Sequence, residues 1–96
     1  MSCGILALLE AKPGKGDDLA AFLKAGRAIA AAEPQTMSWY AFKLSDTTYG
    51  IFDTFADEDG RQAHLTGQMP VELGKIADEL LAKEPDIRPI DILAVK

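Results

Sequence analysis

The sequence has few of the residues that most often mark a recognisable function. It contains a single cysteine, Cys3, which excludes an internal disulfide framework. Its lysines and arginines are outnumbered by acidic residues, the net charge is −5, and no basic cluster indicates a nucleic-acid surface. The apolar run Cys3–Leu9 ends at Glu10, lacks a basic leader and is too short to span a membrane. A soluble, cytoplasmic protein is expected.

Several catalytic and cofactor motifs are also missing. Gly14 and Gly16 do not open a helix with the spacing of a nucleotide-binding loop. No serine stands in a nucleophile elbow, and Cys3 is remote in sequence from the only histidine, His64. The acidic run at positions 57–59 lacks the histidine partners of a metal site and is more typical of a helix start. We therefore expect neither a metal nor another cofactor.

The 96 residues suffice for one domain with one core, which we expect to span positions 1–96. Hydrophobic spacing, turn residues and helix-capping residues predict six elements, with the second helical region broken at Gly67. The first is a buried strand over Ile5–Ala11, followed by a helix from Asp17 or Asp18 to Glu33-Pro34 and by hairpin strands over 36–44 and 48–56. The second helical region starts at Asp57-Glu58-Asp59, resumes at Met69 or Pro70 and ends at Pro85. The last element is a strand over Ile87–Val95.

The resulting order, β-α-β-β-α-β, predicts an α+β fold of the ferredoxin-like type. Its four-stranded antiparallel sheet carries the helices on one face. The last strand lies at a sheet edge in this topology, where Pro89 is tolerable because a missing hydrogen-bond donor costs little there.

The strands are apolar on both faces, although helices can cover only one. In the first strand, Leu6 and Leu8 alternate with further apolar residues, so both faces are apolar. In the third strand, Phe52 points to the face opposite that of Ile51 and Phe55. Leaving such side chains wet forfeits roughly 1.5–3 kcal/mol each. A second copy of the sheet is the simplest cover, so the sequence predicts a two-fold homodimer.

The hairpin register decides which aromatic residues share a face. Pairing of Leu44 with Tyr49 places Tyr40 opposite Asp53 and Phe42 opposite Ile51. We therefore assign Tyr40, Phe42, Asp53 and Phe55 to the helix-covered face and any pocket. Trp39 and Phe52 are assigned to the dimer contact, and a slip of one residue in the turn would exchange the two sets.

The segment FDTFADEDGRQAHL at the end of the hairpin, together with Lys12-Pro13-Gly14-Lys15, resembles the antibiotic biosynthesis monooxygenase-like superfamily of dimeric α+β barrel proteins. The resemblance spans nearly the whole chain in element order and is strongest over residues 47–67. It implies a small homodimer, and several members oxidise quinols or polycyclic phenols without flavin, haem or metal. His64 matches the family's histidine after the third strand. Haem degradation is disfavoured, because the chain has no asparagine and Phe55 stands at the tryptophan position of haem-degrading relatives.

The resemblance therefore implies a cofactor-independent monooxygenase that oxidises a quinol or aromatic polyketide-like substrate with dioxygen. Such chemistry requires that the protein orient an aromatic ring, assist proton removal and exclude water. We expect His64 to be the catalytic base or a proton relay. The expected substrate-binding residues are Tyr40 as a hydrogen-bond donor, Phe42 and Phe55 around the ring, and Asp53 orienting His64 or a substrate hydroxyl.

Structural interpretations of the same residues stay open. His64 is equally compatible with a purely structural role, and the aromatic residues with ordinary core packing. Asp53 is unusual in an apolar strand, because a buried carboxylate needs a partner, and Arg61, Arg88 or a backbone donor would serve. The alternative function is a non-catalytic homodimeric module that binds a small hydrophobic ligand, and a structural dimer without a ligand is the third possibility.

Overall fold

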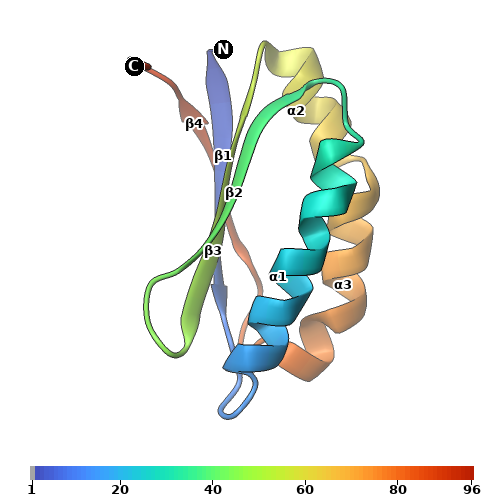
Figure 1. Ribbon diagram of the computed structural model, residues 1–96, viewed down its shortest axis with the longest axis vertical. Coiled ribbons are helices and arrows are strands. Elements are labelled where there is room, and N and C mark those ends of the chain that lie inside the picture. Colours follow the sequence, from blue (N-terminus) through green and yellow to red (C-terminus); the bar gives the residue numbers. More distant parts are fainter. Residues whose placement is uncertain (1) are drawn as a thin grey trace.

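The computed structural model describes residues 2–96, and the elements follow the predicted order (Figure 1). Within this range no helix combines the length and the apolar character that crossing a bilayer requires. The elements are β1 (Cys3–Glu10), α1 (Gly16–Ala31), β2 (Thr36–Lys43), β3 (Thr48–Phe55), α2 (Glu58–Leu65), α3 (Gln68–Leu80) and β4 (Asp86–Asp91).

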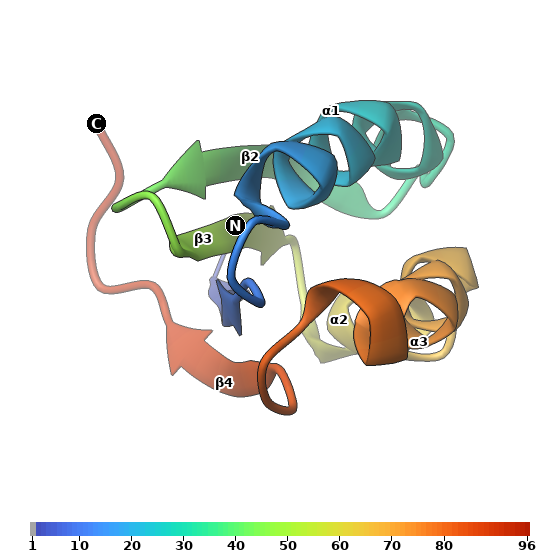
Figure 2. The ribbon, with the colours of Figure 1, turned by 90° about the horizontal axis from the view of Figure 1, so that it is seen from below.

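The four strands form one antiparallel sheet in the order β2-β3-β1-β4. Figure 2 shows α1, α2 and α3 on the same side of this sheet. The predicted ferredoxin-like fold with helices on one face is therefore confirmed. Strand β4 lies at an edge, and Pro89 occupies it as expected.

Several element boundaries differ from the prediction; β1, for example, runs over Cys3–Glu10 and not Ile5–Ala11. Helix α1 begins at Gly16, so Asp17 and Asp18 lie in its first turn and complement the helix dipole without capping it. Helix α3 ends at Leu80, because the next residue turns extended and pairs with Ala11 in an isolated bridge. Strand β4 ends at Asp91, which pairs with Cys3, the first residue of β1.

The hydrophobic core lies between the sheet and the helices. Alternate residues of β1 face inward, and Leu9 is fully buried against Leu19 of α1. Tyr49 and Ile51 of β3 join this cluster, and the fully buried Phe55 extends the core toward α2. The period-two pattern of the strands thus places one apolar set under the helices.

The predicted hairpin register is wrong by one residue. Lys43, and not Leu44, pairs with Tyr49, and Trp39 therefore stands opposite Asp53. Because successive side chains point to opposite faces, this slip exchanges the residues of β2 between the faces but leaves those of β3 in place. In the turn that joins these strands, the carbonyl oxygen of Thr48 accepts hydrogen bonds from the backbone N–H groups of Leu44 and Ser45.

The helix-free face of the sheet consequently carries Tyr40, Phe42 and Phe52, while Trp39 packs against the core under the helices. Tyr40 stacks on Phe52 with ring centroids 6.4 Å apart, and Tyr40 is 60% exposed. Phe42 lies over Gly50, where an added Cβ would come within 2.3 Å of its ring. We call this surface the open face.

Candidate functional site

His64 reaches the sheet because α2 is capped and packed closely at its start. Asp57 accepts a hydrogen bond from the backbone N–H of Gly60 at 3.0 Å, and two acidic residues follow in the first turn. A Cβ at Gly60 would stand 3.2 Å from Gln35, so the missing side chain permits this approach. His64 lies one turn further along the same helix face and therefore also points toward the sheet.

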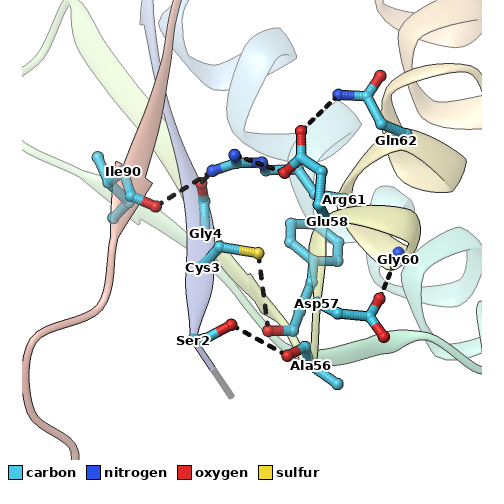
Figure 3. A network of polar contacts seen from close by, with 11 residues as sticks. Ser2, Cys3, Gly4, Ala56, Asp57, Glu58, Gly60, Arg61, Gln62 and Ile90 are labelled. Atoms are coloured by element: carbon cyan, nitrogen blue, oxygen red, sulfur yellow. Dashed lines mark hydrogen bonds and ion pairs between the residues drawn. The ribbon is translucent and has the colours of Figure 1, made fainter.

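Arg61 links α2 to strands β1 and β4 through hydrogen bonds. Its Nη1 donates to the carbonyl oxygens of Gly4 at 3.3 Å and Ile90 at 3.2 Å, and its Nη2 pairs with Glu58 at 2.5 Å (Figure 3). Figure 3 also shows Asp57 at the start of the helix beside this network. These contacts join α2 to β1 and β4, and they hold the helix that carries His64 in place.

The imidazole of His64 lies between two carboxylates. Its Nε2 is 3.0 Å from Oδ2 of Asp53 on β3, and its Nδ1 is 2.7 Å from Oε1 of Glu33. Glu33 follows α1 and also accepts a hydrogen bond from Thr36 Oγ1 at 2.8 Å. Three separate parts of the chain therefore meet at one histidine ring, with both of its nitrogens engaged.

Burial lowers the pKa of His64, but the hydrogen bonds that its ring donates to Asp53 and Glu33, together with the charges of these carboxylates, outweigh it and raise the pKa to about 8. The ring is therefore mostly charged at neutral pH and donates to both carboxylates. In this state it has no free lone pair with which to act as a base.

Asp53 is the most deeply buried charged group of the site. Only 1% of it is exposed, and one of its oxygens, Oδ2, accepts from His64. The other oxygen, Oδ1, has no hydrogen-bond partner among residues 2–96. A buried carboxylate oxygen without a donor is costly, and the ring N–H of Trp39, the residue directly opposite Asp53 in the β2–β3 ladder, is likewise buried without a partner.

A cavity of about 410 Å³ lies beside Asp53 and His64, between the sheet and α3. Its volume lies within the range usual for small-molecule sites. Its wall is apolar apart from Asp53, His64 and the exposed Glu84. The remaining lining residues are Ile5, Ala7, Ile51, Leu65, Met69, Pro70, Leu73, Gly74, Ala77, Pro85 and Ile87.

The structure brings together only part of the predicted site. Asp53 and His64 are in direct contact and line the cavity. Phe55 packs against the His64 ring with centroids 5.3 Å apart, but it is fully buried and is not a lining residue. Tyr40 and Phe42 lie on the open face, away from the cavity, because of the register slip.

The partner of Asp53 is neither of the predicted arginines. Arg61 binds carbonyl oxygens and Glu58, and Arg88 pairs with Asp86 at 2.7 Å. The partner is His64, as one of the sequence-based hypotheses for Asp53 required. An unexplained carboxylate within an apolar strand was thus a sound signal of a buried polar contact.

Sequence analysis missed Glu33 as a member of the site. It was interpreted only as the end of a helix before Pro34, and its contact with His64 spans 31 positions of sequence. The pocket-lining residues of α3 were likewise not assigned to the site. Within the range described, no group of three or more metal-ligating side chains is arranged to hold a metal ion.

Comparison with solved structures places this fold among known proteins. The protein NE2512 of unknown function from Nitrosomonas europaea is 44% identical, with a TM-score of 0.96 over 99% of this chain and 92% of that one. Rv0793 from Mycobacterium tuberculosis is 17% identical, with a TM-score of 0.85 over 99% and 98%. An antibiotic biosynthesis monooxygenase is 12% identical, with a TM-score of 0.79 over 96% and 99%. No family model matches the sequence, and the search of curated proteins returned no match.

The chain therefore has a ferredoxin-like α+β fold, with a partly open cavity between the sheet and α3, and it shares this fold with the antibiotic biosynthesis monooxygenase structure. The chain belongs to the same family as NE2512. The fold that the sequence resemblance implied is confirmed.

Proposed function

We propose that the protein is a cofactor-independent monooxygenase that oxidises a quinol or a related phenol with dioxygen. The observation that supports this proposal is the apolar cavity of about 410 Å³, whose buried polar end is the Asp53–His64 pair. An aromatic ring would bury its surface against the apolar wall, and its hydroxyl would meet the carboxylate. The same wall would keep water from a reactive intermediate.

Asp53, rather than His64, is the proton acceptor in this proposal. The charged imidazole uses both nitrogens, whereas Oδ1 of Asp53 has no partner among the residues described. His64 balances the charge of Asp53 and fixes its orientation, and Glu33 holds His64 from the other side. A base positioned in this way typically contributes a factor of about 10²–10⁴ to the rate.

The chemistry needs no further reactant. The hydroxyl gives its proton to Asp53, and the resulting phenolate passes one electron to dioxygen. The radical pair combines into a C–O bond at a ring carbon that carries hydrogen, and the peroxide takes the proton back from Asp53. Loss of water, with the hydrogen of that carbon, leaves a carbonyl. One oxygen atom enters the product and the other becomes water.

Oxygen consumption with a panel of quinols and naphthols tests the proposal. Wild-type protein should consume oxygen and form the quinone, and Asp53→Asn should lower kcat by about 10²–10⁴-fold. His64→Gln should also lower it, because the carboxylate loses its charged partner. Tyr40→Phe, on the open face, is the matched control and should retain the wild-type rate. Absence of oxygen uptake with every compound would refute the proposal.

The alternative function is a non-catalytic module that binds a small hydrophobic ligand. The nearly continuous apolar wall of the cavity supports this alternative as well as it supports the monooxygenase, because such a wall would bind a hydrophobic ligand without any reaction. Native mass spectrometry of the purified protein discriminates the two functions. A co-purified molecule with no oxygen uptake would support the binding module.

We also propose a homodimer formed through the open face. Phe52, Tyr40 and Phe42 form an aromatic patch there, with Leu6 and Leu8 beside it. Trp39, which was expected in this contact, lies under the helices instead. A second copy of the sheet would cover this apolar area, and sedimentation at micromolar concentration tests the assembly.

A further inference from the structure

The exposure of the lining residues locates the entrance of the cavity. At its polar end, Asp53 is 1% exposed and His64 is 8% exposed. Other lining residues are exposed, and they lie on α3 and on the chain that follows it: Pro70, Gly74, Glu84 and Ile87. In Figure 2, α3 lies beside the edge of the sheet that β4 forms. The cavity therefore opens to solvent between α3 and β4.

Gly74 stands at this opening without a structural requirement for glycine. At the other helical glycines that the structure describes, Gly16, Gly26 and Gly60, an added Cβ would come within 2.6, 2.8 and 3.2 Å of another atom. At Gly74 an added Cβ meets nothing within 4 Å, and the backbone is not in the left-handed region. Glycine is less favourable in a helix interior than any residue except proline. The local structure would thus accept a side chain at position 74.

We infer that ligands enter the cavity between α3 and β4, and that Gly74 keeps this entrance open. Position 74 is exposed and also lines the cavity, so a side chain longer than that of alanine would stand in the opening. Gly74 therefore determines which ligands reach Asp53 and His64 by their width, without itself offering them a polar group. The inference rests on the proposed function only in that the cavity binds a ligand.

The entrance does not compete with the proposed dimer contact. Ile87 pairs with Ala7 in the β1–β4 ladder, and both line the cavity on the helix-covered face of the sheet. Tyr40, Phe42 and Phe52 lie on the open face, and none of them lines the cavity. A second sheet on the open face would leave the entrance free, so the same experiment serves for monomer and dimer.

Stopped-flow binding of an uncharged fluorescent probe tests the inference. The probe is N-phenyl-1-naphthylamine, whose fluorescence rises in apolar surroundings. An uncharged probe suits a wall that includes the acidic Glu84 and, among the residues described, no lysine or arginine. The imidazole NMR signal of His64, the single histidine, shows whether the probe reaches the cavity. The fluorescence traces then give the association and dissociation rate constants.

Gly74→Phe should slow association and dissociation together, each by about tenfold or more, because a barrier at the entrance opposes passage equally in both directions. The Kd should therefore change by less than about threefold. Gly74→Ala should keep both rate constants within about twofold of wild type, since its Cβ meets no other group. If Gly74→Phe fails to fold, Gly74→Leu carries the same prediction.

Val71→Phe is the matched control. It places the same side chain on the same helix, at an exposed position that does not line the cavity. Both rate constants should stay within about twofold of wild type. Slowing by Val71→Phe as strong as that by Gly74→Phe would overturn the inference.

The remaining outcomes separate this inference from the monooxygenase proposal. A probe that leaves the His64 signal unshifted in wild type, or that binds Gly74→Phe at wild-type rates, would overturn the inference. A raised Kd without slower association would overturn it as well, because the side chain would then fill the cavity instead of narrowing its entrance. Slowed binding to Gly74→Phe, with no oxygen uptake by wild type, would retain the entrance and refute the monooxygenase. Oxygen uptake with unchanged binding rates would do the reverse.

Discussion

The folded protein should lose stability as the pH rises through the titration of His64. Its pKa is raised from 6.5 to about 8, because the two carboxylates favour the charged ring more than burial disfavours it. A pKa that is higher in the folded than in the unfolded state stabilises the fold below the unfolded pKa, and this contribution disappears as the pH passes the folded pKa. At about 1.36 kcal/mol per pKa unit, the free energy of unfolding should fall by about 2 kcal/mol.

Urea unfolding at pH 6 and pH 9, at one fixed protein concentration, measures this difference. Far-UV circular dichroism follows the transition, and Trp39 is the only tryptophan and gives a fluorescence signal. Because the sequence contains one histidine, the imidazole NMR signal can be assigned directly and titrated in the native protein. We expect its midpoint near pH 8.

His64→Gln is the control for this measurement. The variant retains every other titratable group of the chain, so the difference between the two proteins isolates the imidazole. Between pH 6 and pH 9, the free energy of unfolding of wild type should therefore fall by about 2 kcal/mol more than that of His64→Gln. If wild type and variant lose the same amount, or the native imidazole titrates near 6.5, then the carboxylates do not hold the charge on His64.

Three further predictions concern the framework of the site and the open face. Arg61→Ala should lower the free energy of unfolding by about 1–3 kcal/mol, because it removes two hydrogen bonds to strand carbonyl oxygens. The control is Arg88→Ala, which breaks an exposed ion pair and should change the free energy of unfolding by less than about 0.5 kcal/mol. Urea titration compares the two. Gly4→Ala places a Cβ 2.5 Å from the carbonyl oxygen of Asp53 and should cost about 1–3 kcal/mol in the same assay, while Gly74→Ala, whose Cβ meets nothing, should stabilise α3 by up to about 1. Phe52→Asp should convert the proposed dimer to monomer in sedimentation experiments, and Val71→Asp, at an exposed apolar position of α3, should leave the assembly unchanged; a monomeric wild type would refute the dimer.

The sequence predicted the elements well because hydrophobic period and capping residues act locally. Asp57 does cap α2, Pro89 does lie in an edge strand, and the helices do cover one face. Asp53 could also be singled out, because a carboxylate between Ile51 and Phe55 conflicts with an apolar strand. These inferences depend on residues that are close in sequence or on a simple physical conflict.

The register of the hairpin could not be predicted from residues that are close in sequence. Two pairings of β2 with β3 fit the same turn residues, and they differ only in which side chains of β2 face the helices. The protein adopts the pairing that buries Trp39 against the core and leaves Tyr40 and Phe42 on the open face. That choice depends on packing against α1 and α3, which only the assembled fold contains.

The amino-acid sequence by itself determined the topology and the two residues at the centre of the site, Asp53 and His64. Only the tertiary structure decided that Glu33 completes the site, that His64 is charged and fully engaged, and that one oxygen of Asp53 is buried without a hydrogen-bond partner among residues 2–96. The physical reason is that pKa and hydrogen-bond satisfaction depend on distances between groups far apart in the chain. Local patterns fix each element, but they do not fix which buried polar atoms meet when the elements pack.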